Sequence, residues 1–402
     1  MTRILLGQLG SNGDCFYATA IARQLKHDFP DCHLTWAISN LCRRVIDNNP
    51  HVDAVWEVDV PGWGEMRRVW PIFEQEAWQE VALGTFDQAY LTQVFPSHFC
   101  NFDGTVRPPL FRNFPHPITV PIDPVIRLTA EEEERVDEWA AAHKLSSFRK
   151  VVLCECSSKS GQSFVTPALM VEVARIVGET DPDIAFILST HEAIDVDSPR
   201  VMHGGELTMR ETARLTHHAD MFVGCGSGLT VMSTSSAAKP SLPSMQILAA
   251  STSVFASFKH DFDHFGLSSD HYIETTVSDP ERLAQMVLYA LDEGPAACQA
   301  RYGQTISPDF EHYFDLIDQM LIRPRHYVDA AQSLNVTIER YGPRPVLCAF
   351  AKAVVLPFLD LDPKAAFPRG RREGDRLAML ISRPVPAAEP PLRSPAEASE
   401  TA

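Results

Sequence analysis

The sequence is poor in positive charge. Its 402 residues contain 35 Lys and Arg against 52 Asp and Glu, which gives a formal net charge of −17. Nucleic-acid-binding surfaces draw their affinity from clustered basic side chains, so this balance argues against a nucleic-acid partner. An anionic ligand would have to be held locally, by backbone amides and a few well-placed cations.

The sequence also lacks a hydrophobic run long enough to cross a bilayer. The longest candidate, residues 345–361, is interrupted by Lys352 and Pro357 and is shorter than the roughly 20 residues that a spanning helix needs. The first residues lead directly into an apolar strand pattern, without the basic and hydrophobic segments of a signal peptide. We therefore expect a cytoplasmic protein.

Metal-binding patterns are scarce as well. The nine cysteines show no paired spacing of the metal-binding type, and Cys154 and Cys156 lie on one face of an apolar strand, which suits small core side chains. The run 259–265 groups four potential metal ligands, but such short runs are more often polar loops. The four potential ligands are His260, Asp261, Asp263 and His264. We expect neither a metal nor a cofactor.

Strand and helix patterns alternate in two stretches of the chain. The first stretch covers residues 2–95, a Pro-rich passage at 107–125 breaks the pattern, and the alternation restarts at residue 130. This rhythm predicts an α/β protein with two Rossmann-like, doubly wound parallel-sheet domains that face a cleft. Two further helices are expected over 279–293 and 310–322.

These patterns suggest four segments. We expect an N-terminal Rossmann-like acceptor domain over 1–125 and a C-terminal Rossmann-like donor domain over 126–325. Residues 326–383 form an extension whose structure the sequence does not indicate. Residues 384–402 are rich in Pro, Ala, Glu and Ser and have little to bury, so we expect a disordered tail.

Each predicted sheet domain carries a glycine turn between a strand and the next helix. The first turn contains Gly7, Gly10, Gly13 and Asp14. Its spacing is not the G-x-G-x-x-G pattern, so a dinucleotide site is poorly supported. Such turns lie at the carboxyl edge of a parallel sheet, where open α/β proteins bind ligands. Facing domains would bring the first turn close to the second, which spans residues 224–228.

Asp14 has two interpretations. A carboxylate in the first turn of a helix commonly caps the free backbone amides. A carboxylate that faces a cleft can instead act as a general base. Residue type and spacing alone favour the capping interpretation.

The second turn has the composition of an anion site. Its glycines allow a ligand to approach the backbone, the following helix presents free amides, and Ser227 and Thr230 add hydroxyl groups. The alternative is a tight turn that merely uses glycine. A third loop, residues 156–163, contains one cation, Lys159, which could neutralise phosphate charge, although a single loop lysine is usually only solvated.

Two stretches, residues 3–39 and 48–58, resemble the opening of glycosyltransferase family 9, the ADP-heptose:lipopolysaccharide heptosyltransferases, which have a GT-B fold. That opening has a strand, an L-x-x-x-G-D loop and a long helix before the second strand. Residues 206–240 are similar to the family segment that binds the donor. There Gly226 stands at the family's Asp and Val231 at its His.

The resemblance implies a role for each matching residue. Asp14 becomes the base that deprotonates the acceptor hydroxyl in an inverting sugar transfer from a nucleotide-diphosphate donor, and the family's own donor makes heptose the sugar that the resemblance implies. The glycines of the first turn let the acceptor sugar approach the backbone. The implied acceptor-side loop is Gly10, Ser11, Asn12 and Gly13, and the implied donor-binding residues are Lys159, Gln162, Thr208, Met209, Gly226, Ser227, Gly228, Leu229 and Thr230.

The resemblance also suggests partners. It favours an ADP-linked sugar as donor and a saccharide or glycolipid as acceptor, and a lipid-linked acceptor implies peripheral contact with the inner face of the cell membrane. The K-x-W-P sequence of the family's donor loop is not present, and either Lys159 or Gln162 takes the place of its lysine.

Two other functions stay open. A nucleotide-sugar epimerase would use the same diphosphate site without a separate acceptor. A non-catalytic nucleotide-sugar-binding protein is suggested by the loss of the family's Asp and His. Release of nucleotide that depends on an acceptor would separate a transferase from both.

Overall fold

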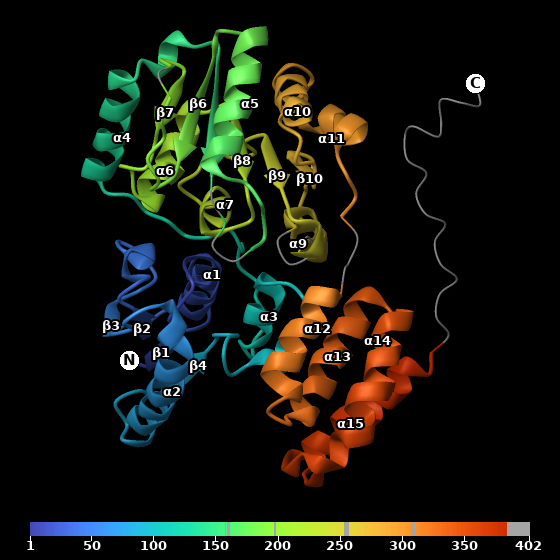
Figure 1. The fold of residues 1–402 in the computed structure, drawn as a ribbon. Coiled ribbons are helices and arrows are strands. Elements are labelled where there is room, and N and C mark those ends of the chain that lie inside the picture. Colours follow the sequence, from blue (N-terminus) through green and yellow to red (C-terminus); the bar gives the residue numbers. More distant parts are fainter. Residues whose placement is uncertain (157, 159–160, 197, 253–256, 307–309, 384–402) are drawn as a thin grey trace, which may run out of the picture. The chain divides into compact units, whose positions relative to one another are not determined.

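The structure is a computed structural model that describes residues 1–156, 158, 161–196, 198–252, 257–306 and 310–383. The chain forms two compact units. The first comprises residues 1–93 and 113–308, and the second comprises residues 94–112 and 309–402. Figure 1 shows the ribbon with its elements labelled.

The first unit contains a four-stranded parallel sheet in the order β3-β2-β1-β4. Ile4, Leu5 and Leu6 of its central strand are fully buried, as is typical of a parallel sheet covered on both faces. The strands and their helices are β1 (Arg3–Gly7), α1 (Asn12–Asp28), β2 (His33–Ser39), β3 (Ala54–Val58), α2 (Met66–Ala82) and β4 (Gln88–Leu91).

One predicted helix of this region is much shorter than expected. The pattern at residues 41–49 predicts a helix, but the structure forms only a single 3-10 turn, η1 (Arg43–Ile46). Asn48 then takes a left-handed conformation (φ 57°), and Pro50 follows two residues later. A left-handed residue does not continue a right-handed helix, and a proline cannot donate the backbone hydrogen bond that a helix interior needs.

The same unit contains a six-stranded parallel sheet in the order β10-β9-β8-β5-β6-β7. Its strands are β5 (Lys150–Glu155), β6 (Ile184–Ser189), β7 (Val201–His203), β8 (Met221–Gly224), β9 (Ser244–Ile247) and β10 (Tyr272–Thr275). The helices around it are α4 (Ala130–Ala142), α5 (Pro167–Thr180), α6 (Met209–Leu215), α7 (Gly228–Met232), α9 (Phe258–His264), α10 (Pro280–Glu293) and α11 (Pro295–Tyr302).

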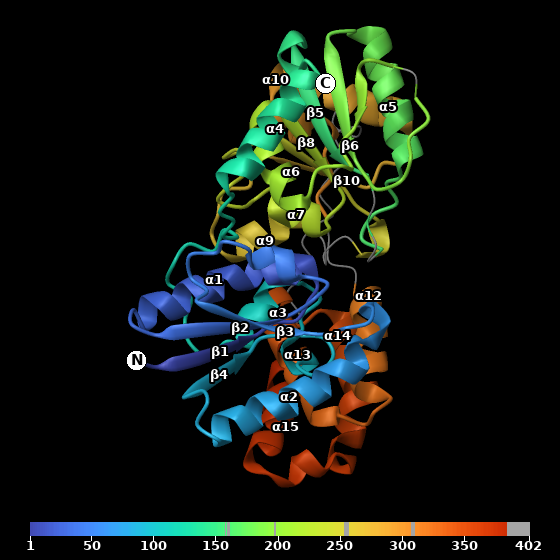
Figure 2. The ribbon, with the colours of Figure 1, turned by 90° about the vertical axis from the view of Figure 1, so that its left-hand side faces the viewer.

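Helices cover both faces of the six-stranded sheet. Val152 and Cys154 of β5 pack into the core beneath α5 and α10, whereas Val151 and Leu153 pack into a second core with α4 and α6. Figure 2 shows α4 and α5 on opposite sides of strands β5 and β6. The predicted α/β class with two doubly wound parallel sheets is therefore confirmed. Cys154 and Cys156 are free and buried, and burial raises the pKa of both thiols.

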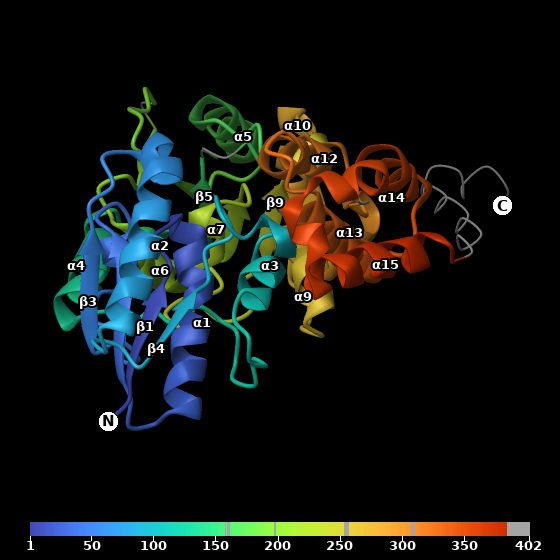
Figure 3. The ribbon, with the colours of Figure 1, turned by 90° about the horizontal axis from the view of Figure 1, so that it is seen from below.

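The second unit is helical. Residues 94–112, which we expected to belong with the first sheet, pack instead with the C-terminal helices, and the Pro-rich passage begins with a helix rather than a loop. Ser333 donates a hydrogen bond to the Phe102 carbonyl at 2.7 Å. The helices, which Figure 3 shows grouped together, are α3 (Arg107–Arg112), α12 (Glu311–Ile317), α13 (Tyr327–Tyr341), α14 (Pro345–Phe350) and α15 (Pro368–Ile381).

A buried ion cluster joins the two chain segments of this unit. The carboxylate of Asp103, which has no exposed surface, lies 2.6 Å from Arg112 and 2.9 Å from Arg340. The two positive charges compensate the burial of the Asp103 carboxylate. The expected tail, residues 384–402, lies outside the described residues.

Candidate functional site

The first glycine turn is held by two buried glutamine side chains. Gln93 accepts hydrogen bonds from the backbone amides of Leu9 (2.8 Å) and Gly10 (3.1 Å). Gln8 donates to the carbonyl of Gly10 at 2.8 Å. The turn is therefore fixed by side-chain contacts before any ligand binds.

The glycines of this turn make room for the protein itself. A Cβ atom at Gly10 would stand 2.6 Å from a ring carbon of Trp63. A Cβ at Gly13 would stand 3.5 Å from a methyl group of Val231 and 3.7 Å from the Cα of Gly228. Our explanation that glycine at position 10 admits an acceptor sugar is therefore corrected, because the indole ring of Trp63 fills that space.

Asp14 lies in the first turn of α1 and completes a capping box with Ser11. Its carboxylate accepts hydrogen bonds from the Ser11 amide at 3.0 Å and the Ser11 hydroxyl at 3.2 Å. Burial nevertheless raises the pKa of Asp14 to about 6, against the lowering effect of these two hydrogen bonds. A carboxyl group with this pKa is ionised at neutral pH and accepts a proton more readily than an ordinary aspartate.

The second turn surrounds a carboxylate that belongs to the chain. Glu155, at the end of β5, is 2% exposed. One of its oxygens accepts hydrogen bonds from the Cys225 amide (3.0 Å) and the Thr230 hydroxyl (2.6 Å). The other accepts from the Leu229 amide (3.2 Å) and the Ser227 hydroxyl.

This arrangement bears directly on the expected diphosphate site. The donor groups of Ser227, Leu229 and Thr230 are already engaged by Glu155. A diphosphate could use them only in place of that carboxylate. Sequence reasoning missed Glu155, and its one signal was an acid between two small apolar residues at the end of a buried strand.

The structure brings the two glycine turns together, as the sequence predicts. A Cβ atom at Gly228 would stand 3.5 Å from both the Gly13 nitrogen and the Asn12 Cβ, and 3.1 Å from the Met209 methyl group. The Asn12 amide also lies 3.7 Å from the Met209 sulfur. Predicted residues from α1, α6 and α7 therefore meet at one junction.

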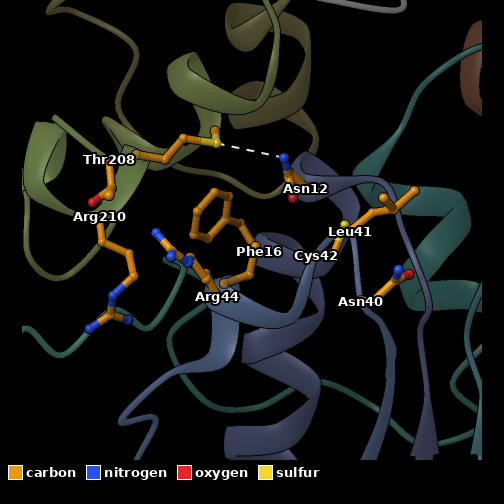
Figure 4. Close-up of a pocket in the computed structure, with 10 residues that line it drawn as sticks. Asn12, Phe16, Asn40, Leu41, Cys42, Arg44, Thr208 and Arg210 are labelled. Atoms are coloured by element: carbon orange, nitrogen blue, oxygen red, sulfur yellow. Dashed lines mark hydrogen bonds between the residues drawn. The ribbon is translucent and has the colours of Figure 1, made fainter. Parts of the chain in front are cut away.

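A cavity of about 280 Å³ opens beside this junction. Thr208 and Met209, which the resemblance places near the nucleotide, are among its walls. Figure 4 shows Asn12 and Phe16 in the wall of the cavity, and its dashed line marks the contact between the Asn12 amide and the Met209 sulfur. The lining residues are Asn12, Phe16, Asn40, Leu41, Cys42, Arg44, Val45, Thr208, Met209 and Arg210.

The two arginines of the cavity differ in their contacts. Arg210 is buried and engaged by the Glu132 carboxylate at 2.7 Å and by the Asp47 and Arg127 carbonyls at 2.7 and 2.8 Å. Arg44 makes no side-chain hydrogen bond or ion pair with the residues that the structure describes, and Figure 4 shows its guanidinium beside Phe16. Sequence reasoning did not single out Arg44, although it belongs to an Arg-Arg pair after the second strand.

The other predicted donor residues have structural contacts. Thr208 caps α6 and accepts the Glu211 amide at 3.2 Å. Gln162 is buried, accepts the Ser158 hydroxyl with its side chain and accepts the Ala249 amide with its carbonyl at 2.8 Å. Lys159 lies outside the described residues.

The structure offers no metal centre in the part of the chain that it describes. No group of three or more His, Cys, Asp or Glu side chains there is placed to hold an ion. The run 260–264 lies within helix α9 rather than in a polar loop. None of the described helices is long and apolar enough to cross a membrane.

Comparison with solved structures shows which known fold this architecture resembles. Glycosyltransferase family 9 protein from Veillonella parvula matches with a TM-score of 0.52 at 14% identity, over 80% of this chain and 97% of that chain. The two proteins share a fold. The expected GT-B architecture is thereby confirmed. At this identity the similarity establishes the fold alone.

Two further structures match more weakly. E. coli ADP-heptose lipopolysaccharide heptosyltransferase II gives a TM-score of 0.48 at 13% identity, over 73% of this chain and 99% of that chain. A putative UDP-N-acetylglucosamine 2-epimerase from Listeria monocytogenes gives 0.47 at 11% identity, over 81% and 96%. No model of a known protein family matches the sequence, and no curated protein is similar to it.

Proposed function

We propose that the protein is a glycosyltransferase that moves a sugar from a nucleotide-diphosphate donor to a hydroxyl group of a saccharide or glycolipid, with inversion. Asp14 is the general base. The observation that carries the proposal is the place of Asp14: a carboxyl of raised pKa in a rigid turn that abuts the second glycine turn. The sequence resemblance to glycosyltransferase family 9 supports the same assignment.

The position of Asp14 determines the steps of the proposed transfer reaction. The acceptor oxygen forms a bond to the anomeric carbon as the bond from that carbon to the diphosphate oxygen breaks, and the acceptor proton passes to the Asp14 carboxylate. A base with a pKa of about 6 is free to take that proton at neutral pH. Ser11 and Gln93 hold the turn, so the base needs little reorganisation before the reaction.

On the donor side, we assign the nucleoside to the cavity lined by Thr208 and Met209, with Arg44 as a cation in its wall. Gly226 allows the diphosphate to approach the backbone, whereas Gly228 packs against Met209 and the first glycine turn. The loop with Lys159 and Gln162 supplies further contacts. Ser227, Leu229 and Thr230 shape this turn through Glu155. ADP-heptose is the first donor to test, because the resembling family uses it.

One observation favours a second candidate function. Glu155 already accepts the hydrogen bonds that the turn can donate. The negative charge of its carboxylate would also repel a diphosphate at that point. A protein with this arrangement could bind a nucleotide sugar through the cavity without transferring the sugar. The second candidate is therefore a non-catalytic nucleotide-sugar-binding protein.

The test compares the parent protein with Asp14→Asn. Both are mixed with ADP-heptose and other nucleotide sugars, with and without saccharide acceptors, and nucleotide release and melting temperature are measured. We expect release that depends on the acceptor and falls by about 10²- to 10⁴-fold in the variant. Nucleoside diphosphate should raise the melting temperature of both proteins.

The other outcomes separate the candidates. Stabilisation of both proteins without release under any condition would favour the binding protein. Release that does not depend on Asp14 would remove its role as base. A protein that no nucleotide stabilises has no donor site, and the proposal would then fail.

A further inference from the structure

One large aromatic side chain beside the first glycine turn is open to solvent. Trp63 is 46% exposed and belongs to a short 3-10 turn, η2 (Trp63–Glu65), that precedes α2. The indole rings of Trp36 and Trp70 are by contrast fully buried. Burial of an indole removes a large apolar area from water, and Trp63 forgoes much of this stabilisation. A large part of its surface is left for a ligand.

The ring of Trp63 packs by one edge against the first glycine turn. A Cβ atom at Gly10 would stand 2.6 Å from the Cζ3 atom of the ring and 3.1 Å from its Cη2 atom, and 3.5 Å from the methyl carbon of Met66. The next residue, Ser11, donates its backbone amide to the Asp14 carboxylate at 3.0 Å. The edge of the indole and the carboxylate therefore meet adjacent residues of one turn.

The surroundings of the indole are sparsely covered. No atom would lie within 4 Å of a Cβ atom at Gly62 or Gly64, the two neighbours of Trp63 in the chain. In the part of the chain that the structure describes, the indole stacks on no other aromatic ring. Ser11 is exposed and Asp14 is half-buried. The ring and the polar groups beside it are thus accessible from the same side of the sequence turn.

The loop that carries Trp63 is fixed at both ends. Asn40, a wall residue of the cavity, accepts the Val60 amide with its side chain at 2.9 Å, and Val60 is fully buried. The Glu65 amide donates to the Gly62 carbonyl at 2.9 Å and closes the turn around the indole. Because the loop is already held, a ligand that binds to the ring has little to order.

An exposed indole beside a carboxylate and a hydroxyl group has the chemistry of a carbohydrate site. One face of a pyranose ring consists of C–H groups, whose partial positive charge is attracted to the negative face of an aromatic ring. The hydroxyl groups of the sugar form hydrogen bonds with neighbouring carboxylate and hydroxyl groups. An anionic ligand would be repelled by Asp14, and a wholly apolar ligand would leave the polar groups beside the ring without a partner.

We propose that Trp63 is the stacking platform for the acceptor sugar. The C–H face of a pyranose ring lies on the indole, and a hydroxyl group of the same ring reaches Asp14. Trp63 then selects the acceptor, since it favours a ring with an apolar face over an open-chain polyol. The absence of a side chain at Gly10 seats this platform rather than the sugar itself. The inference rests on the proposed function, because it assigns part of the acceptor site.

The first test is saturation-transfer NMR on the full-length protein with the methyl β-pyranosides of glucose, galactose and mannose. These probes share one face that carries three axial C–H groups. We expect saturation to pass most strongly to those axial hydrogens, and none to pass to sorbitol, which has similar hydroxyl groups but no ring. Trp63→Leu should lower the transfer about threefold to tenfold. Trp63→Phe should keep most of it, because the aromatic face remains.

Trp78 provides the matched control. It is 49% exposed on α2 and lies about 18 Å along that helix from Met66, at 1.5 Å per residue. Trp78→Leu removes a similar indole from another place and should leave the transfer unchanged, with equal melting temperatures in all variants. No transfer to any of the three pyranosides, equal transfer to sorbitol, an unchanged signal in Trp63→Leu, or equal loss in Trp63→Phe and Trp63→Leu would each overturn the proposal.

Kinetics separates this proposal from the proposed function. The NMR measurement needs neither a donor nor turnover. In the transfer assay, Trp63→Leu should raise the KM for the acceptor by the same factor as it weakens binding and leave kcat within about twofold. Sugar binding at Trp63 without any transfer would overturn the transferase and leave the platform intact. Transfer with an unchanged KM in Trp63→Leu would overturn the platform and leave the transferase intact.

Discussion

The hydroxyl of Thr230 lies 2.6 Å from a carboxylate oxygen of Glu155, inside the turn that the sequence predicts as an anion site. A second buried acid, Glu274 at β10, has a similar relation to α9. It accepts the Ser257 hydroxyl at 2.8 and 2.9 Å and the Lys259 amide at 3.1 Å. In both places an acid on a strand satisfies the donors at the start of a short helix.

Glu155→Gln should lower the free energy of unfolding by about 2–4 kcal/mol, because an amide cannot accept all four hydrogen bonds and the charge that strengthens them is lost. Denaturant unfolding measures the effect. Glu179→Gln, a change in an exposed ion pair with Arg175, serves as control and should stay within about 0.5 kcal/mol. An unchanged stability in Glu155→Gln would show that the carboxylate does not hold the turn.

Thr230→Val separates the two occupants of that turn. If Glu155 is the permanent acceptor, this variant loses about 1 kcal/mol of stability and its affinity for nucleoside diphosphate is unchanged. Isothermal titration with ADP measures the affinity. Weaker binding in the variant would mean that the diphosphate displaces Glu155 and uses the hydroxyl itself.

The sequence predicted those features that depend on neighbouring residues. Apolar runs located β1, β5 and β6, and the glycine turns located the junction at Gly13 and Gly228. Short strands such as β7 (Val201–His203) were missed, because three residues hold too little periodicity. The predicted helix after Ser227 is only five residues long in the structure, α7 (Gly228–Met232).

The sequence could not predict features that depend on distant partners. Glu155 meets residues about 70 positions away, and Asp103 meets Arg340 from the other end of the chain. Nothing near Gly10 in the sequence indicates that Trp63 will cover it. These contacts arise only after the sheets and helices have packed, so an acid or a glycine in isolation carries no sign of them.

Gly10 and Gly13 should respond differently to alanine. Gly10→Ala drives a methyl group into the Trp63 ring, which stands 2.6 Å from that position, and such overpacking typically costs about 1–3 kcal/mol. Gly13 lies within α1 and its added methyl would meet Val231 at an ordinary 3.5 Å. Gly13→Ala should therefore be neutral or stabilising by about 0.5–1 kcal/mol. Thermal unfolding measures both, and a shift in tryptophan fluorescence in Gly10→Ala alone would report displacement of the indole.

Asp103→Asn should destabilise the second unit by about 3–5 kcal/mol, because it leaves Arg112 and Arg340 without their buried counter-charge. Burial raises the pKa of Asp103, but the two arginines outweigh it and hold the pKa below 3.8. Its stabilising contribution is therefore complete above pH 3.8 and is lost as the pH falls through the lower folded value. Circular dichroism melts from pH 7 to pH 3 test this. The exposed Asp315→Asn is the control, and an equal effect of both substitutions would refute the role of the cluster.

Asp14→Asn should make the protein more stable at pH 8 and leave its stability almost unchanged at pH 3. Burial raises the pKa of Asp14 from 3.8 to about 6, so between these values the unfolded chain loses the proton while the folded protein keeps it. The stabilisation by the protonated carboxyl is complete below pH 3.8 and is lost by about pH 6, a difference of at most about 3 kcal/mol. The amide does not ionise, and its oxygen can still accept the Ser11 amide. Denaturant unfolding of parent and variant at pH 3, 5 and 8 should therefore show a gap that opens as the pH rises. A gap of constant size would mean that Asp14 titrates normally, and its fitness as a general base would lose its physical support.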